Sequence, residues 1–289
     1  MIKLIITHPG SAHKDDFLAC CVLIAESPVS IHRKDPDSED LDDSSVAVID
    51  VGDRHEPNKK NFDHHQFPRD RVPTCSLSLV LQDLGLYDDA RSFCDWLETA
   101  EWFDCRGANA TANWLGAKRE IIGRMSSPIE LSLLRRFASQ NEHLPGEPLW
   151  EIMKMIGKDL VDYLRGLRRR LQYISEHSEV WNIKREPHSL LAIYLPRTHP
   201  LPDDPSMGLP RFIEENGLAA KAHAMIYPDR RGEGYGLCRY NDHPSMDFNR
   251  ISSEPDVHFV HAAGFIAKTS ATDSQRLQDL LFKSYSGCS

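Results

Sequence analysis

Two short, almost wholly apolar runs constrain the fold most. Residues 2–7 (IKLIIT) and 46–49 (VAVI) are rich in β-branched side chains, and they end at His8 and Asp50 respectively. Strands of this composition are typically buried on both faces, as in a parallel sheet covered by helices. Residues 15–27 follow the first run with helical spacing. We therefore expect an α/β fold with a parallel sheet in the N-terminal part of the chain.

The periodicity of the remaining sequence indicates a second domain. Apolar residues recur at helical steps through residues 147–181, which predicts an unusually long helix. The polar, acidic residues 34–45 are expected to form a solvated loop. Four later runs are strand-like, and they cover residues 189–196, 221–228, 234–240 and 257–267. We predict a metal-binding catalytic domain over 1–145, a connecting helix over 146–183 and a smaller α/β domain over 184–289.

Composition and charge exclude several classes of protein. The 289 residues are 40% hydrophobic, which is enough for two domains, and the net charge of -9 argues against a surface that coats long nucleic acid. Seven cysteines without a C-x-x-C pair indicate reduced thiols. No run has the length of a signal peptide or a membrane span. We therefore expect a cytoplasmic protein that does not contact membranes, and we leave its oligomeric state open.

Oxygen and imidazole donors collect where the predicted strands end. Because the carboxyl ends of parallel strands meet at one edge of a sheet, these donors should converge there. Imidazole and carboxylate groups without a thiolate suit Mn²⁺, Co²⁺, Mg²⁺ or Zn²⁺, and more than four donors favour two ions. The candidate donors are His8, His13, Asp15, Asp50, Asp63, His64 and His65.

Each of these motifs also has a simpler explanation. An isolated histidine pair is more often part of a solvated turn, and Asp15 and Asp16 could merely favour the positive N-terminus of the following helix. For Asp16, we give the helix explanation the same weight as a role in a metal site. For Asp15, we give the helix explanation less weight than a metal site. Asp50 is the sharpest signal, because a carboxylate that ends an apolar strand needs a cap, an ion pair or a cation to offset its desolvation.

The order and spacing of three segments resemble the DHH phosphoesterase superfamily, most closely its branch of MYG-type exonucleases, formerly labelled metal-dependent protein hydrolases. The segments are THPGSAHKDD at 7–16, VIDVGDRHEPNKKNFDHHQ at 48–66 and VHFVHAAGFIAKTS at 257–270. The chain departs from the family pattern at Pro9, where asparagine is usual, and at Lys14, where the residue is usually small or neutral. The resemblance implies a first domain that holds two divalent ions and a second domain that closes over the substrate.

The resemblance also implies roles for individual residues. The implied metal ligands are His8, His13, Asp15, Asp50, His64 and Asp104, and the implied catalytic residues are Asp50, His64 and His65. Asp63 would orient a histidine without binding a metal ion itself. The fourth motif lies in LETAEWFDCRG at 97–107, where Asp104 or Glu101 could be the ligand, and we favour Asp104. The expected substrate-binding residues are His65, His261, Gly264, Lys268 and Arg239, and further cations for a substrate rim are available at Arg230, Arg231 and 168–170.

Such a centre predicts hydrolysis of phosphodiester bonds by two-metal activation of water, most simply with two Mn²⁺ ions. A two-domain clamp with few basic residues suits the end of a strand better than a long duplex, so we expect an exonuclease that acts on RNA ends or short single-stranded oligonucleotides. Two alternatives stay open. One is a small-molecule phosphohydrolase for pyrophosphate or a nucleoside bisphosphate, and the other is a metal-binding regulatory protein without catalysis.

Overall fold

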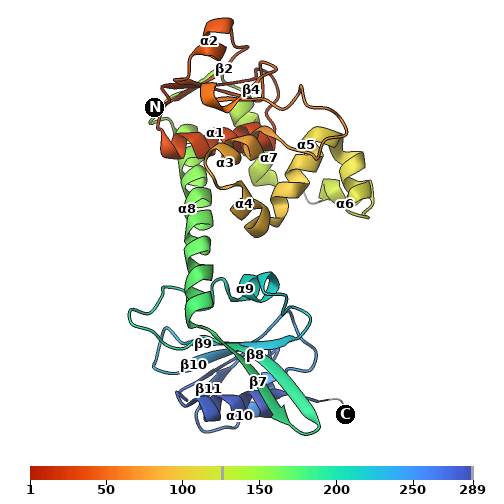
Figure 1. The fold of residues 1–289 in the computed structure, drawn as a ribbon, viewed down its shortest axis with the longest axis vertical. Coiled ribbons are helices and arrows are strands. Elements are labelled where there is room, and N and C mark those ends of the chain that lie inside the picture. Colours follow the sequence, from red (N-terminus) through yellow and green to blue (C-terminus); the bar gives the residue numbers. More distant parts are fainter. Residues whose placement is uncertain (125–126, 288–289) are drawn as a thin grey trace. The chain divides into compact units, whose positions relative to one another are not determined.

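The computed structural model describes residues 1–124 and 127–287, and the chain divides into two compact units, Met1–Gly166 and Leu167–Ser289 (Figure 1). Each unit holds a six-stranded sheet with helices, and helix α8 (Pro148–His177) contributes residues to both. This confirms the predicted α/β class with a long connecting helix. The division after Gly166 falls inside the segment predicted to connect the domains. The limits at 145 and 183 therefore stay a prediction.

The first unit is built on a mostly parallel sheet with the strand order β4-β5-β3-β1-β2-β6. The inner neighbours pair in parallel, while the short edge strands β4 and β6 pair antiparallel. All four residues of β3 are buried, which explains the apolar composition of that run. The strands are β1 (Leu4–Thr7), β2 (Ser30–Arg33), β3 (Val46–Ile49), β4 (His55–Glu56), β5 (Asn61–Phe62) and β6 (Glu142–His143).

Seven further helices belong to the described part of the first unit. They are α1 (Lys14–Glu26), α2 (Ser38–Asp42), α3 (Ser76–Asp83), α4 (Tyr87–Phe93), α5 (Asp95–Trp114), α6 (Arg119–Arg124) and α7 (Pro128–Ala138), and a 3-10 turn covers Pro57–Lys59. Helix α2 corrects the expectation of a loop over residues 34–45. The Asp37 carboxylate accepts hydrogen bonds from the N–H groups of Glu39 and Asp40, so this polar stretch forms a capped helical turn. Its apolar side chain, Leu41, is buried in a core cluster with Val46 and Val48.

The second unit has a sheet of order β11-β12-β10-β9-β8-β7, in which only β8 and β9 pair in parallel. Its strands are β7 (Glu179–Arg185), β8 (His188–Tyr194), β9 (Ala222–Pro228), β10 (Tyr235–Arg239), β11 (Val257–Val260) and β12 (Ile266–Thr269). Helices α9 (Leu209–Glu215) and α10 (Ser274–Ser284) and a 3-10 turn (Phe248–Ile251) complete it. The core gathers large buried side chains such as Trp181, Leu237 and Phe248.

Two sequence expectations for the second unit are wrong. Residues 257–267 do not form one strand, because the chain turns at His261 and Gly264 and continues as β12. Residues from Glu179 onward form β7 and do not extend the long helix. The alternation of exposed and buried side chains in β7 is a strand pattern that the preceding helical periodicity concealed. Among the described residues, no helix has the length and apolar content that a membrane span requires.

Candidate metal centre

Three neighbouring strands deliver polar side chains to one edge of the first sheet. His8 follows β1, Asp50 follows β3 and Asp63 follows β5, and these strands are adjacent and parallel. Asp50 adopts a left-handed backbone conformation with φ of 59°. Aspartate tolerates this conformation better than most residues. The turn at Asp50 ends the strand and brings a carboxylate to the edge where His8 lies.

The N-terminus of α1 supplies a second group of donors. His13 is the residue before the helix, and its N–H donates to Asp16 Oδ1 at 2.7 Å. Asp15 and Asp16 lie in the first turn and are both buried. Asp16 thus fulfils the helix-capping role that we had weighed for it, but its Oδ2 also lies 3.3 Å from His8 Nε2. The carboxylate therefore serves the helix and faces the centre.

His64 joins the strand edge to helix α5. Its Nε2 lies 3.1 Å from Asp50 Oδ1 and 2.9 Å from Asp104 Oδ2. On the other side of Asp50, Oδ2 lies 3.5 Å from His8 Nε2. The two oxygens of one carboxylate thus face two imidazoles, which is an arrangement suited to a bridging ligand.

The donor atoms form four overlapping sets, and within each set the potential ligand atoms lie within 4.8 Å of one another. The sets share Asp50, His64, His13 and Asp104, so together they make one continuous cluster. The sets are His8–His13–Asp50, Asp50–His64–His65, His64–Asp104–Cys105 and His13–Asp15–Asp104. All six metal ligands implied by the sequence resemblance are brought together here.

The donors of this cluster fit divalent cations, because many of them lack any other partner. Five buried nitrogen or oxygen atoms of the cluster have no hydrogen bond to any described residue: His8 Nε2, Asp15 Oδ1, Asp16 Oδ2, His64 Nε2 and Asp104 Oδ2. Leaving buried polar atoms without partners is unfavourable by about 1–3 kcal/mol each. Cations that these atoms could ligate would remove that cost.

The electrostatics of the cluster point the same way. Burial, followed by repulsion from Asp50, Asp104 and Asp16, raises the pKa of Asp15 well above its usual value. Burial alone would lower the pKa of His64, but the carboxylates of Asp104 and Asp50 raise it to about 12. Both shifts include the effect of neighbouring carboxylates, whose negative charge favours positive charge at this position. Oxygen and imidazole donors favour Mn²⁺, Mg²⁺, Co²⁺ or Zn²⁺ without selecting one of them.

Asp63 and His65 form a pair beside the cluster. His65 Nδ1 lies 2.7 Å from Asp63 Oδ1, and the second carboxylate oxygen accepts the N–H of Asp53 at 2.7 Å. The hydrogen bond to Asp63 raises the pKa of His65. The His65 side chain is 58% exposed, so it is fixed by Asp63 and still accessible to a substrate. Asp63 thus contacts a histidine beside the cluster, and its role in orienting that histidine stays a prediction.

Asp104 and Glu101 have different surroundings, although both belong to α5. Asp104 faces His64 and His13, whereas the buried Glu101 accepts hydrogen bonds from Ser78, Tyr87 and Arg91. The Glu101 carboxylate is therefore occupied by protein donors, and it belongs to none of the described metal-ligand sets. The geometry favours Asp104 as the ligand of the fourth motif.

We expect a pair of isosteric variants to separate these two roles. Asp104→Asn should weaken Mn²⁺ binding about 100-fold with little change in stability, because it removes a charged ligand. Glu101→Gln should lower the free energy of unfolding by about 1.5–3 kcal/mol and leave metal affinity unchanged, because it weakens charged hydrogen bonds. Calorimetric titration with Mn²⁺ and urea unfolding measure both quantities. The opposite pattern would make Glu101 the ligand.

Three residues that sequence reasoning missed also support the centre. Ser76, at the start of α3, donates its hydroxyl to Asp50 Oδ1 at 2.7 Å. Cys105 lies beside His64. Arg33, at the end of β2, is buried and donates to the backbone carbonyls of Gly10 and Ser11 at 3.1 and 3.3 Å, which fixes the loop between His8 and His13. Only the position of Arg33 at a strand end could have signalled its role, since the other contacts depend on the tertiary fold.

The four expected substrate-binding residues of the second unit have different surroundings. His261 is exposed at the turn between β11 and β12, so it is not a histidine buried in the sheet. Gly264 has φ of 65°, and an added Cβ would lie only 2.1 Å from Asp247 Oδ1. Lys268 Nζ lies 2.7 Å from Asp229, and Arg239 lies 2.8 Å from Asp242. These two cations are therefore already held by carboxylates.

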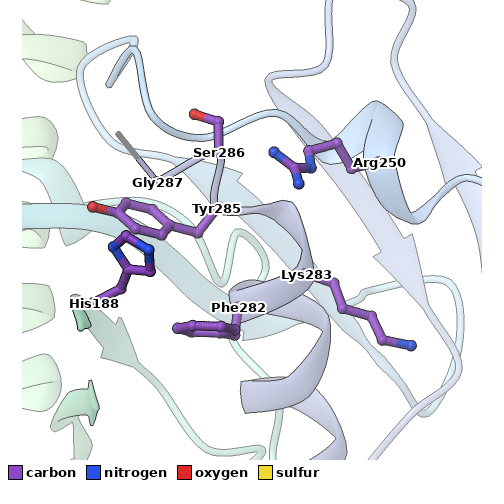
Figure 2. A pocket seen from close by; sticks show the side chains of 7 residues that line it. All are labelled: His188, Arg250, Phe282, Lys283, Tyr285, Ser286 and Gly287. Atoms are coloured by element: carbon purple, nitrogen blue, oxygen red, sulfur yellow. The ribbon is translucent and has the colours of Figure 1, made fainter. Parts of the chain in front are cut away.

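A hollow of about 500 Å³ is present in the second unit. It is lined by His188, Arg250, Phe282, Lys283, Tyr285, Ser286 and Gly287 (Figure 2). In Figure 2 the rings of His188 and Tyr285 lie against each other, and Lys283 points away from them. Lys283 Nζ binds Glu254 at 2.6 Å. None of the expected substrate residues contributes to this hollow.

Fold and site together define an α/β protein with a carboxylate–histidine cluster at the carboxyl edge of a parallel sheet. Residues 4–80 match the model of the family MYG1_exonuc, described as Uncharacterised protein family (UPF0160). The resemblance that the motifs indicated is thereby confirmed for this segment. It contains every implied metal ligand except Asp104. No curated protein matches the chain.

Two solved structures are similar to this chain at low identity. One is the pGpG-specific phosphodiesterase PggH from Vibrio cholerae, with 12% identity, a TM-score of 0.29 and coverage of 96% of this chain and 97% of that chain. The other is the DHH domain of a member of the s1p family of ribosomal proteins, with 12% identity, a TM-score of 0.33 and coverage of 98% and 86%. With scores this low, neither similarity supports an argument about function.

Proposed function

We propose that this protein is a divalent-metal-dependent phosphoesterase that hydrolyses phosphodiester bonds at the ends of RNA or short single-stranded oligonucleotides. The observation that carries the proposal is the convergence of buried donor atoms that make no hydrogen bond to a described residue, from His8, Asp15, Asp16, His64 and Asp104. The family match over residues 4–80 supports a hydrolytic phosphoesterase. Phosphodiester chemistry suits such a cluster because a phosphoryl group carries negative charge that cations can neutralise.

The protein's own residues would bind and position the ions and the substrate. His8, His13, Asp15, His64 and Asp104 would hold two divalent cations with Asp50 between them, and the Ser76 hydroxyl would keep the Asp50 carboxylate oriented. When bound, the cations would supply Lewis-acid activation of water and neutralise charge on the phosphoryl oxygens. His65 uses Nδ1 toward Asp63, which leaves Nε2 available to a substrate phosphate oxygen.

A panel of substrates tests the proposal. The purified chain with Mn²⁺ should shorten a 5′-labelled single-stranded RNA by one nucleotide at a time and should cleave a linear dinucleotide. Pyrophosphate should be hydrolysed much more slowly. Preferential hydrolysis of pyrophosphate would instead establish a small-molecule phosphohydrolase. Tight metal binding with no hydrolysis of any substrate would establish a regulatory protein.

His261 offers a prediction that concerns substrate and not metal. Its Nδ1 accepts the N–H of Ala263 at 3.1 Å, so its Nε2 is the ring atom available to a phosphate. Loss of one such hydrogen bond to a charged group corresponds to about a 10-fold weaker interaction. We therefore expect His261→Ala to raise KM about 10-fold while bound metal and thermal stability stay unchanged.

A neighbouring histidine provides the control for this measurement. His258 is also exposed, but it lies on β11 with its Nε2 3.9 Å from Asp229. His258→Ala should leave KM unchanged, as measured with the same dinucleotide. Equal kinetics for the His261 variant and the wild-type chain would remove His261 from the substrate-binding residues.

A further inference from the structure

Cys105 occupies a specific position next to a candidate metal ligand. It follows Asp104 on α5, and its Sγ lies 3.8 Å from His64 Nδ1 and 3.5 Å from the carbonyl oxygen of Thr74. Both contacts join residues that are distant in the sequence, because His64 and Thr74 lie 41 and 31 residues from Cys105. The thiol is thus brought to the imidazole by the packing of α5 against the loop before α3.

The two nitrogens of His64 face different groups. Nε2 faces the carboxylates of Asp50 and Asp104 at 3.1 and 2.9 Å, whereas Nδ1 faces Cys105. A neutral imidazole that ligates a cation through Nε2 must carry its proton on Nδ1. Metal-binding histidines almost always donate this second N–H to a fixed acceptor, which sets the tautomer and the ring orientation.

Sulfur can serve as that acceptor because its own proton is used elsewhere. The Cys105 S–H donates to the Thr74 carbonyl, which leaves the sulfur lone pairs for the Nδ1–H of His64. The described part of the chain offers Nδ1 no other hydrogen-bond partner. The His65 ring stacks on His64 at a centroid distance of 4.6 Å, so the imidazole is held both at its edge and at its face.

We propose that Cys105 is a positioning residue that holds His64 in the tautomer and orientation needed to bind a cation through Nε2. This inference rests on the proposed metal centre. Hydrogen bonds would run in one direction, from His64 Nδ1–H to Cys105 Sγ and from Cys105 S–H to the Thr74 carbonyl. Cys105 also belongs to a set of potential ligand atoms with His64 and Asp104, but its sulfur lies at His64 Nδ1, so in this proposal it supports His64 and does not bind the cation.

Three variants of the 289-residue chain test this role by calorimetric titration with Co²⁺ alone. Cys105→Ala should weaken Co²⁺ binding about 10- to 100-fold, which is typical for loss of such a supporting group. Cys105→Ser should recover most of the affinity, because a hydroxyl also accepts and donates. Cys238→Ala removes a thiol from the second unit, where it donates to the Arg239 carbonyl, and this variant should bind Co²⁺ like the wild-type chain.

Spectra of the same samples separate positioning from the alternatives. The wild-type chain should show cobalt d–d bands without a thiolate-to-cobalt charge-transfer band, and ¹⁵N chemical shifts of the Zn²⁺-loaded chain should place the His64 proton on Nδ1. Wild-type affinity in Cys105→Ala, no recovery in Cys105→Ser, or a charge-transfer band would overturn the positioning role. Failure of the wild-type chain to bind Co²⁺ would refute the metal centre itself, which is a distinguishable result.

Discussion

Asp50→Asn should lower kcat for phosphodiester hydrolysis about 10²- to 10³-fold and reduce the number of bound ions. The buried Asp50 carboxylate directs one oxygen to His64 and the other to His8, so it is the side chain best placed to be shared by two ions. Replacing it by a neutral amide removes ligand charge, and a loss of a few kcal/mol in transition-state stabilisation corresponds to that factor.

The choice of asparagine follows from the backbone. Asp50 has φ of 59°, a conformation that asparagine tolerates and alanine does not, and the amide oxygen can still accept the Ser76 hydroxyl. The metal-free variant should therefore unfold at the same temperature as the wild-type chain or slightly higher, because one of several repelling carboxylates is gone.

A nearby aspartate is the matched control. Asp53 also has a left-handed backbone, with φ of 53°, but it belongs to none of the described ligand sets. Asp53→Asn should keep both metal and activity. If Asp50→Asn kept its ions and its rate, or if it unfolded at a much lower temperature, Asp50 would be a structural cap of the strand.

Divalent metal should raise the unfolding temperature of the first unit by about 5–10 °C. A ligand at 100 times its Kd stabilises the folded state by about 2.7 kcal/mol, and each kcal/mol shifts the midpoint by about 2–4 °C in a domain of this size. The physical source is the relief of repulsion around Asp15, whose pKa is raised by burial and by Asp50, Asp104 and Asp16.

Differential scanning calorimetry with Mn²⁺, and again after addition of EDTA, measures this shift. Asp50→Asn should show a much smaller shift at the same Mn²⁺ concentration, and Asp53→Asn should show the full one. A wild-type midpoint that does not move with Mn²⁺ would mean that the carboxylates are stabilised without a cation.

The part of the site that lies at the strand ends could be predicted from the sequence, because the carboxyl ends of parallel strands meet at one edge of a sheet. His8, Asp50 and Asp63 end adjacent parallel strands, so their meeting follows from the strand pattern alone. Asp104 required the family resemblance, since nothing in its local pattern distinguishes it from Glu101. The geometry separates them because Ser78, Tyr87 and Arg91 surround Glu101.

Contacts between residues distant in the sequence could not be predicted. Lys268 was expected to be available to a substrate, but Asp229, 39 residues away in the sequence, holds it at 2.7 Å. Lys14 likewise binds Glu130 at 3.1 Å. Ion pairs of this kind depend on which loops the fold brings together.

The most direct test of the metal centre is the number of ions bound per chain. Wild-type protein should be dialysed against Mn²⁺, freed of excess ion and analysed by plasma mass spectrometry beside Asp50→Asn and Asp53→Asn. The overlapping donor sets around Asp50 predict about two Mn²⁺ per wild-type chain, the same for Asp53→Asn and fewer for Asp50→Asn. A wild-type chain that retains no Mn²⁺ would contradict the proposed centre.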